Sequence, residues 1–411
     1  MFIGHFTEEP WQKEDWPVEW GSGVMAVSNR EYDPVRAANL YHRYIDEKQY
    51  AEEMGFDGIM VNEHHSAPFC MNGVANVKAS ILARVTNKAK ILLLGNILPI
   101  HDDPLWLAES LAMIDVISRG RLIPGVVRGG GSESLTHNIP PHYNRERFEE
   151  AHDFLIKTWT TPGPFRWEGK HFHYRYVNPW AVPYQKPHPP IWVPGTSSRE
   201  TVEWCARHRY PYIMLASQID LTQQMYQVYY DTAREVGYEA GPQHLGFMFF
   251  FHVEETEERA IEVGRTLTQG VRSPYDPGAQ RPKPWIAGPP GIATKSARAL
   301  RRKMTAADSS GRTRAGARAT FEDQVATHGM VVGTPDSVIP KVRYILEELR
   351  PGTIIFRTGD GAMDHESQMR TLKLMGEEVM PKLREIADEL GLPGPYDIDP
   401  MTNEPVAAMA S

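Results

Sequence analysis

The chain has 411 residues, of which 41% are hydrophobic and 23% are charged, and its formal net charge is −8. This acidic balance argues against a nucleic-acid or anionic-membrane binder, and two cysteines are too few for a disulfide framework. No apolar run approaches the roughly 18 residues of a membrane span, and the first residues lack the basic and apolar regions of a signal peptide. We therefore expect a cytoplasmic protein without nucleic-acid or membrane partners.

Short apolar runs alternate with longer amphipathic segments along the chain. The short runs are typical of buried parallel strands, and the longer segments have the helical spacing of apolar residues. Predicted strands cover 2–6, 58–61, 90–94, 122–127, 191–193, 212–215, 245–253 and 353–357. Predicted helices cover 34–54, 74–86, 104–120, 144–160, 198–208, 221–236, 255–267, 335–349 and 363–390.

Two segments interrupt this alternation. Residues 161–190 are rich in Pro, Trp, His and Tyr, and we expect an irregular surface excursion there. Residues 271–325 show no long apolar period and contain the basic stretch from Arg298 to Lys303, so we expect an insertion or a mobile lid. The basic stretch is interpreted as a solvated face, with a clamp on a phosphate or an anionic substrate as the alternative.

The repeated strand–helix units predict parallel strands joined by right-handed crossovers. Eight such units favour a closed (β/α)8 TIM barrel, with residues 1–411 in a single domain. An open, doubly wound sheet is the alternative.

The stretch most informative about function follows the second predicted strand. Glu63, His64 and His65 come directly after the apolar run 58–61. Ligands bind at the C-terminal ends of the strands in α/β barrels and in open α/β sheets. Because an imidazole can act as an acid or a base near neutral pH, this stretch predicts a catalytic site, with His64 as its centre. The simpler alternative is a histidine that only forms a hydrogen bond at a strand end.

A metal site is another interpretation of the acidic and imidazole side chains Glu63, His64, His65 and His101. Adjacent residues at a strand end point in different directions. Neither a His-Glu-x-x-His helix nor a Cys-x-x-Cys pair is present. We therefore predict no metal.

Two further segments favour a phosphate site. Arg128 ends a strand just before three glycines, where a guanidinium can pair with a phosphate that the glycine backbone approaches closely. Residues 195–198 join a strand to a helix whose first N–H groups can bind an anion. An ordinary N-cap at Ser198 or Thr196 is the alternative, and both can hold together. The G-x-G-x-x-G spacing of a dinucleotide site is missing.

Taken together and in this order, these segments resemble the bacterial luciferase-like flavin monooxygenases. The residues that carry the resemblance include Gly55-Phe56-Asp57-Gly58, Glu63-His64-His65, His101-Asp102-Asp103-Pro104, Ser118-Arg119-Gly120-Arg121, Gly125-Val126-Val127-Arg128-Gly129, Asn144-Arg145 and Gly195-Thr196-Ser197-Ser198. The similarity covers most of residues 1–270 and resumes near 331–335. These motifs are specific to the family but not to a substrate.

The resemblance implies a barrel that binds reduced FMN and activates dioxygen as a flavin peroxide. It also implies a homodimer and a separate NAD(P)H-dependent reductase that supplies the reduced flavin. His64 matches the catalytic histidine of the family, and Glu63 and His65 are candidate catalytic partners that orient it. The candidate cofactor-binding residues are Asn96, Arg128, Arg145, Gly195, Ser197, Ser198 and Thr201. Val127 stands where luciferase itself has a cysteine, which argues against carrying over bioluminescence.

We therefore predict a two-component FMN-dependent monooxygenase that oxidises a small organic substrate. The aromatic residues of 161–190 favour a bulky apolar or aromatic substrate. Three alternatives stay open at this point: a deazaflavin-dependent oxidoreductase on the same barrel, a non-catalytic flavin-binding protein and a metal-dependent hydrolase.

Overall fold

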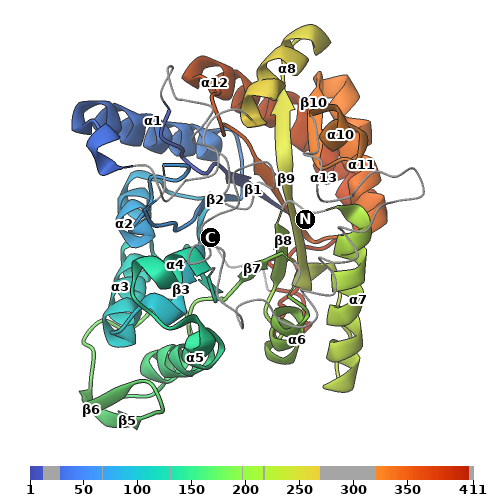
Figure 1. Ribbon diagram of the computed structural model, residues 1–411. Helices are drawn as coiled ribbons and strands as arrows, with labels where there is room; N and C mark the ends of the chain where they lie inside the picture. Colours follow the sequence, from blue (N-terminus) through green and yellow to red (C-terminus); the bar gives the residue numbers. More distant parts are fainter. Residues whose placement is uncertain are drawn as a thin grey trace, which may run out of the picture.

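The computed structural model describes residues 1–12, 28–66, 68–129, 131–196, 198–215, 218–268 and 321–406. In these residues, parallel strands form the centre of the molecule and helices form an outer ring (Figure 1). The central strands are β1 (Phe2–Phe6), β2 (Gly58–Val61), β3 (Lys90–Ile97), β4 (Leu122–Val127), β7 (Val193–Gly195), β8 (Tyr212–Leu215), β9 (Leu245–Val253) and β11 (Thr353–Arg357).

The strands follow the order β4-β3-β2-β1-β11-β9-β8-β7, and their pairs are parallel. A parallel bridge between Gly125 of β4 and Trp192, directly before β7, joins the two ends of this sheet. The Val126 N–H donates to the Trp192 carbonyl over 3.3 Å, and the Trp192 N–H donates to the Pro124 carbonyl over 3.2 Å. The predicted (β/α)8 barrel is confirmed.

The apolar runs of the strands are continuous because both faces of the sheet are buried. On β2, Met60 points into the barrel, whereas Ile59 and Val61 pack against the helices. The barrel interior is filled by Phe2, Phe6, Met60, Leu92, Leu94, Ile123, Trp192, Ile213, Met248 and Ile355. The barrel is thus a packed core, and its open end is left for binding.

Apart from α4 (Gly131–Thr136) and α10 (Phe321–Ala326), which were not predicted, the helices lie close to their predicted positions. The other helices are α1 (Pro34–Glu53), α2 (Ala75–Val85), α3 (Pro104–Ile117), α5 (Asn144–Thr160), α6 (Arg199–His208), α7 (Ile219–Glu235), α8 (Glu257–Gly264), α11 (Pro335–Leu349), α12 (His365–Leu374) and α13 (Met380–Leu390). A π-helical stretch, Met375–Val379, joins α12 to α13. None of the helices in the described residues is both long and apolar enough to cross a membrane.

The expectation of an irregular excursion at 161–190 is wrong for its middle part. β5 (Phe165–Glu168) and β6 (His173–Val177) form an antiparallel hairpin there. The Glu150 carboxylate of α5 accepts the N–H groups of the hairpin turn, namely those of Lys170, His171 and Phe172. The rings of Trp167 and Tyr174 pack on Phe154 of α5, at centroid distances of 5.3 and 4.8 Å. These aromatic rings therefore pack against α5, outside the barrel.

One further strand was also not predicted. β10 (Met330–Gly333) pairs with the second half of β9, beyond the part that pairs with β11. Of the expected insertion at 271–325, residues 321–325 belong to the helix α10. The remaining positions, 271–320, including Arg298 to Lys303, lie outside the described residues.

Two of the sequence motifs hold the barrel together. The buried Arg121 donates to Thr86 and to the carbonyl groups of Ala83, Ala89 and Ser118. Asp57 accepts the N–H of Ile3 over 2.8 Å and pairs with both terminal nitrogens of Arg384, over 3.1 Å each. These contacts join β1 to the loop before β2 and to the last helix, so these motifs have a structural role.

Candidate cofactor and active site

Those predicted site residues that the structure describes lie at or after the C-terminal end of a barrel strand, or at the start of a following helix. Glu63, His64 and His65 follow β2, Asn96 lies near the end of β3, and Arg128 follows β4. Because the barrel strands are parallel, these residues share one rim of the barrel. Ser198 and Thr201, at the start of α6 after β7, and Arg145, at the start of α5, belong to the same rim.

His64 lies between two carboxylates. Its Nδ1 is 3.2 Å from Oε1 of Glu133, and its Nε2 is 3.9 Å from Oε2 of Glu8. The ring of Phe69 packs beside it at 4.6 Å, and 31% of the His64 side chain is exposed. Burial opposes protonation, but the hydrogen bond to Glu133 and the charges of Glu8 and Glu133 outweigh it, so the pKa of His64 is raised above its ordinary value.

Glu8 is itself fixed by donors from two strand ends. Asn62, after β2, donates through Nδ2 to Glu8 Oε2, and Arg357, at the end of β11, lies 3.0 Å from Glu8 Oε1. Arg357 also pairs with Asp360, and Asp360 accepts the N–H of Glu8 over 2.7 Å. No sequence motif marks these side chains, although Glu8 and Arg357 also lie at C-terminal strand ends.

Glu63 and His65 form a separate network beside His64. His65 Nε2 lies 3.0 Å from Glu63 Oε1, and Asn96 Nδ2 donates to Glu63 Oε2 over 3.3 Å and to Asn76 over 2.9 Å. The ring of His137 stands 4.2 Å from that of His65. Glu63 therefore contacts His65 and Asn96, whereas the carboxylates beside His64 are those of Glu133 and Glu8.

Burial lowers the pKa of the nearby His101, which the metal interpretation of the sequence had included. Within the part of the chain that the structure describes, no three or more His, Cys, Asp or Glu side chains are arranged to hold a metal ion.

The predicted phosphate residues converge at the start of α6. Arg145 Nη2 donates to Thr201 Oγ1 over 3.2 Å, and Thr201 Oγ1 donates to Ser198 Oγ over 3.1 Å. Burial lowers the pKa of Arg128, and the positive charge of Arg145 lowers it further, while Glu200 partly offsets this. The repulsion between Arg128 and Arg145 is what a bound anion would relieve.

The backbone at this helix start is also suited to an anion. Ser198 is the N-cap of α6, and its side chain makes no capping bond but donates to Glu200 over 3.3 Å. The first N–H groups of α6 can therefore bind an anion. A Cβ on Gly195 would lie 2.9 Å from the Tyr212 ring, so this position needs glycine for packing. Ser197 lies outside the described residues.

The short helix α4 connects the two parts of the rim. Its Glu133 contacts His64, and the next residue, Ser134, accepts a hydrogen bond over 2.7 Å from Asn144 at the start of α5. Arg145 follows Asn144 directly. One six-residue element thus ties the histidine to the arginine pair.

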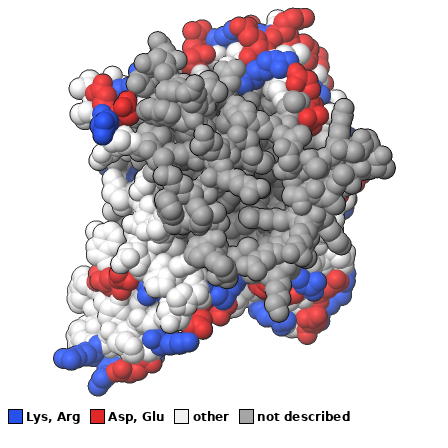
Figure 2. Space-filling model, in the orientation of Figure 1, with Lys and Arg blue, Asp and Glu red and all other residues white. Residues whose placement is uncertain are grey.

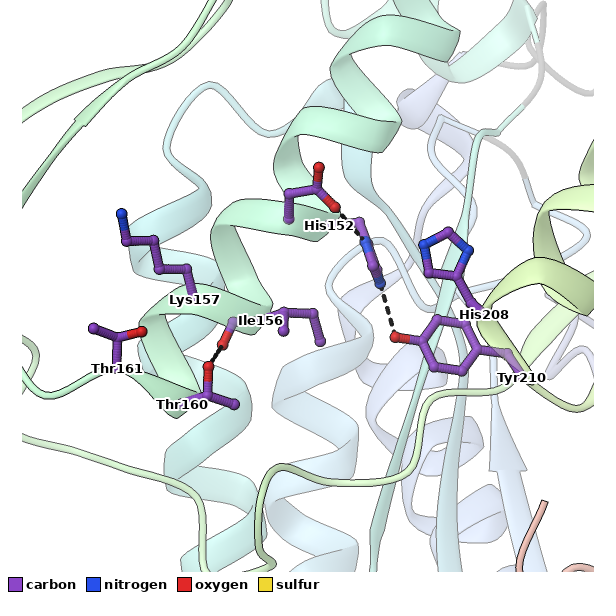
Figure 3. Close-up of a pocket in the computed structure, with 8 residues that line it drawn as sticks. His152, Ile156, Lys157, Thr160, Thr161, His208 and Tyr210 are labelled. Carbon is purple, nitrogen blue, oxygen red and sulfur yellow. Dashed lines mark hydrogen bonds and ion pairs between the residues drawn. The ribbon is translucent and has the colours of Figure 1, made fainter. Parts of the chain in front are cut away.

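A groove of 450 Å³ lies between α5 and the segment that follows α6, and Figure 3 shows the side chains that line it. His152 lies 2.9 Å from the Tyr210 hydroxyl through Nε2 and 3.0 Å from Asp153 through Nδ1. His208 and Tyr210 precede β8, and Thr160 ends α5. The groove is therefore at the N-terminal end of the strands, away from His64.

Enzymes built on such barrels bind their ligands at the C-terminal rim, where this chain places His64, Arg128 and Arg145. The chain belongs to the luciferase-like monooxygenase family, whose model matches residues 22–351. The predicted family is confirmed.

Similar proteins include the alkanal monooxygenase alpha chain of Photorhabdus luminescens, which is 27% identical over 219 residues, or 53% of this chain and 60% of that one. The matches span about half to two thirds of the length of such relatives. The oxygenating constituent of the 3,6-diketocamphane monooxygenase of Pseudomonas putida, solved with FMN, has a TM-score of 0.68 at 19% identity and covers 93% of this chain and 98% of its own. An F420-dependent secondary alcohol dehydrogenase has a TM-score of 0.62 at 13% identity and covers 93% and 99%. At these identities the two structures show a shared fold alone.

Proposed function

We propose that this protein is a monooxygenase that uses reduced FMN and dioxygen to oxidise a small organic substrate, by the flavin-peroxide route expected from the sequence. The observation that carries the proposal is the convergence of Arg128, Arg145 and the start of α6 on one rim. A phosphate there would offset the repulsion between the guanidinium groups and accept the N–H groups of the helix.

The residues present fit FMN at its phosphate end. Arg128, Arg145, Ser198 and Thr201 would hold the phosphate. Reduced FMN, when bound, supplies the electrons with which dioxygen is activated. The chain itself binds and orients the cofactor and holds a proton on His64. Asn96 directs its Nδ2 to protein partners, and its Oδ1 has no partner among the described residues, so this oxygen is the atom that could accept a ring N–H.

The proposal extends to the partners of the protein. We propose a separate NAD(P)H-dependent reductase as the source of reduced flavin, and a homodimer as the assembled form of the protein. An apolar or aromatic substrate stays a prediction. It was inferred from the aromatic residues of 161–190, but the rings of Trp167 and Tyr174 in the hairpin pack on α5. A cytoplasmic location also stays a prediction.

The test is an anaerobic titration with reduced FMN and, in parallel, with reduced riboflavin, which lacks the phosphate. We expect saturable binding that is tighter for FMN. Arg145→Gln removes a charged donor, so it should weaken FMN binding about 10- to 100-fold and leave riboflavin binding unchanged. Arg175→Gln, on the exposed edge of the hairpin, is the matched control and should change neither affinity.

Mixing the reduced complex with oxygenated buffer then tests the chemistry. We expect a transient absorbance that differs from those of reduced and oxidised flavin. Binding of F420, a deazaflavin, with no binding of FMN in either redox state would contradict the proposal and favour deazaflavin-dependent hydride transfer. Equal affinities for FMN and riboflavin would contradict the phosphate site.

A further inference from the structure

We infer that Glu133 and Glu8 position His64 as an imidazolium, with one carboxylate at each ring nitrogen, so that His64 serves this site as a proton donor. The role of a donor rests on the proposed function. The charge of His64 rests on the geometry alone and can be measured without a cofactor.

The first argument is the donor count of the ring. A neutral imidazole carries a proton on one nitrogen only, whereas the imidazolium carries one on each, and an ionised carboxylate can only accept. Glu133 lies 3.2 Å from Nδ1, and Glu8 lies 3.9 Å from Nε2. Only the imidazolium directs an N–H group toward each of the two carboxylates and places a positive charge between them.

The second argument is that Glu8 is fixed in place beside His64. Asn62 donates to one of its oxygens, and Arg357 lies 3.0 Å from the other. Arg357 opposes a positive charge on His64, but this guanidinium is already paired with Asp360 as well as with Glu8. Among the residues that the structure describes, the charged groups around His64 are Glu133 from α4, Glu8 after β1, and the Arg357–Asp360 pair after β11.

The neighbouring histidine provides an internal comparison. His65 pairs through Nε2 with Glu63, which also accepts from Asn96. The structure gives His65 one carboxylate and His64 two. The histidine that lies between two carboxylates is therefore His64, the residue that matches the catalytic histidine of the family.

The two carboxylates have different tasks. The bond of Glu133 to Nδ1 fixes the orientation of the ring. The gap of 3.9 Å between Glu8 and Nε2 is longer than a hydrogen bond and leaves the Nε2 proton available to a reactant. In the transfer, the N–H bond of Nε2 breaks and its electron pair returns to the ring. An O–H bond forms on a reactant oxygen that develops negative charge, and the neutral ring regains a proton from water at its exposed edge.

The test is a histidine-ring NMR titration of the cofactor-free protein, with the His64 signal assigned by its loss in His64→Asn. We expect a pKa for His64 above 6.5 in the wild type. Glu133→Gln should lower it by about 1 unit or more, because a neighbouring charge is lost. Glu133→Asp should restore part of the shift, and Glu8→Gln should lower the pKa by less because its contact is longer. Glu168→Gln, an exposed carboxylate on the hairpin, is the control and should have no effect.

The pH profile of product formed per reduced flavin gives the second measurement. The yield should fall as pH rises through the pKa of His64, and Glu133→Gln should move this fall to lower pH by the shift seen in NMR. A wild-type pKa at or below 6.5, or a pKa unchanged in both Glu133→Gln and Glu8→Gln, would overturn the inference. If the expected NMR shifts are absent but FMN binds normally, only this inference is contradicted. If the NMR shifts are present but FMN does not bind, only the proposed function is contradicted.

Discussion

His64 and His244 show how the surroundings set the charge of the same side chain. Two carboxylates raise the pKa of His64. His244 is fully buried, and burial lowers its pKa to about 4. Its Nδ1 accepts the N–H of Gly241 over 3.1 Å, so Nε2 carries the proton and donates to the Pro400 carbonyl over 2.9 Å. Protonation of Nδ1 would remove the bond to Gly241.

This buried histidine predicts a loss of stability in acid. The pKa of His244 is lower in the folded chain than in the unfolded chain, so the unfolded chain binds more protons between about pH 6.5 and 4. The free energy of unfolding should therefore fall as pH is lowered through this window, with His244 contributing about 1.4 kcal/mol per pH unit. Denaturant unfolding of wild type and His244→Gln at a series of pH values measures this.

The control for this prediction is His173→Gln, at an exposed position on β6. His244→Gln should flatten the acid slope, whereas His173→Gln should leave it unchanged. Equal slopes in wild type and His244→Gln would show that His244 is protonated at its ordinary pKa in the folded protein.

At the scale of single residues, the sequence motifs predicted His64 as a site residue but did not predict the side chains that contact it. His64 stands in a recognisable stretch after an apolar strand. Glu133 is 69 residues away along the chain and reaches His64 only because a short helix follows β4. No local pattern marks Glu8 or Arg357 as its neighbours, because that contact depends on the closure of β1 beside β2 and β11.

Among the elements, all eight barrel strands were predictable because strands buried on both faces read as continuous apolar runs. The hairpin β5–β6 was missed because its residues alternate between part-buried and exposed and its rings mix with Arg, His and Glu. β10 has only four residues and lies beside an insertion-like composition. The hairpin was therefore missed because its burial is incomplete, and β10 because it is short and lies next to that composition.

Strands β3 and β4 approach each other closely at Gly125, and β4 leads to Arg128. A Cβ on Gly125 would lie 2.5 Å from the Leu93 carbonyl oxygen and 2.8 Å from the Leu94 Cα, both of which are backbone atoms. Gly125→Ala must therefore push the strands apart at the point where β4 also bridges to Trp192. We expect a loss of about 1–3 kcal/mol in the free energy of unfolding and weaker FMN binding.

Gly329→Ala is the control, because a Cβ there would meet its nearest atom at 3.6 Å, an ordinary contact. Its stability and FMN affinity should match the wild type. If Gly125→Ala is as stable as Gly329→Ala, the two strands have room to separate and the barrel end is more adaptable than the structure indicates.

At the scale of the whole molecule, the described residues include a stripe of exposed apolar side chains along α2 and α3. Helix α3 buries one face against the barrel, yet its opposite face is also apolar, with Trp106, Met113, Val116 and Ile117 each 46–55% exposed. The neighbouring α2 exposes Val77 and Ile81. Figure 2 shows little charge at the left edge, where α2 and α3 lie, and mixed charges at the upper edge, near α8 and α12. A helix that is apolar on all sides is normally covered on all sides.

A second copy of the chain is the partner we propose for this α2–α3 face. Most soluble assemblies are two-fold dimers in which the same patch meets itself. In such a dimer, the exposed apolar side chains of the two copies can interdigitate across the two-fold axis, and the contact requires no pairing of charges. We therefore expect a mass of twice 46.6 kDa in light scattering after gel filtration.

Met113→Lys tests this face, because it would place two ammonium groups in an apolar contact, where burying an unpaired charge is costly. We expect the dimer to dissociate, with a dissociation constant at least about 100-fold higher. Ile261→Lys is the matched control: Ile261 is 42% exposed on α8, among charged residues, and its substitution should leave the mass unchanged. A wild-type mass of 46.6 kDa, or dissociation by Ile261→Lys instead, would place the partner of α2 and α3 elsewhere.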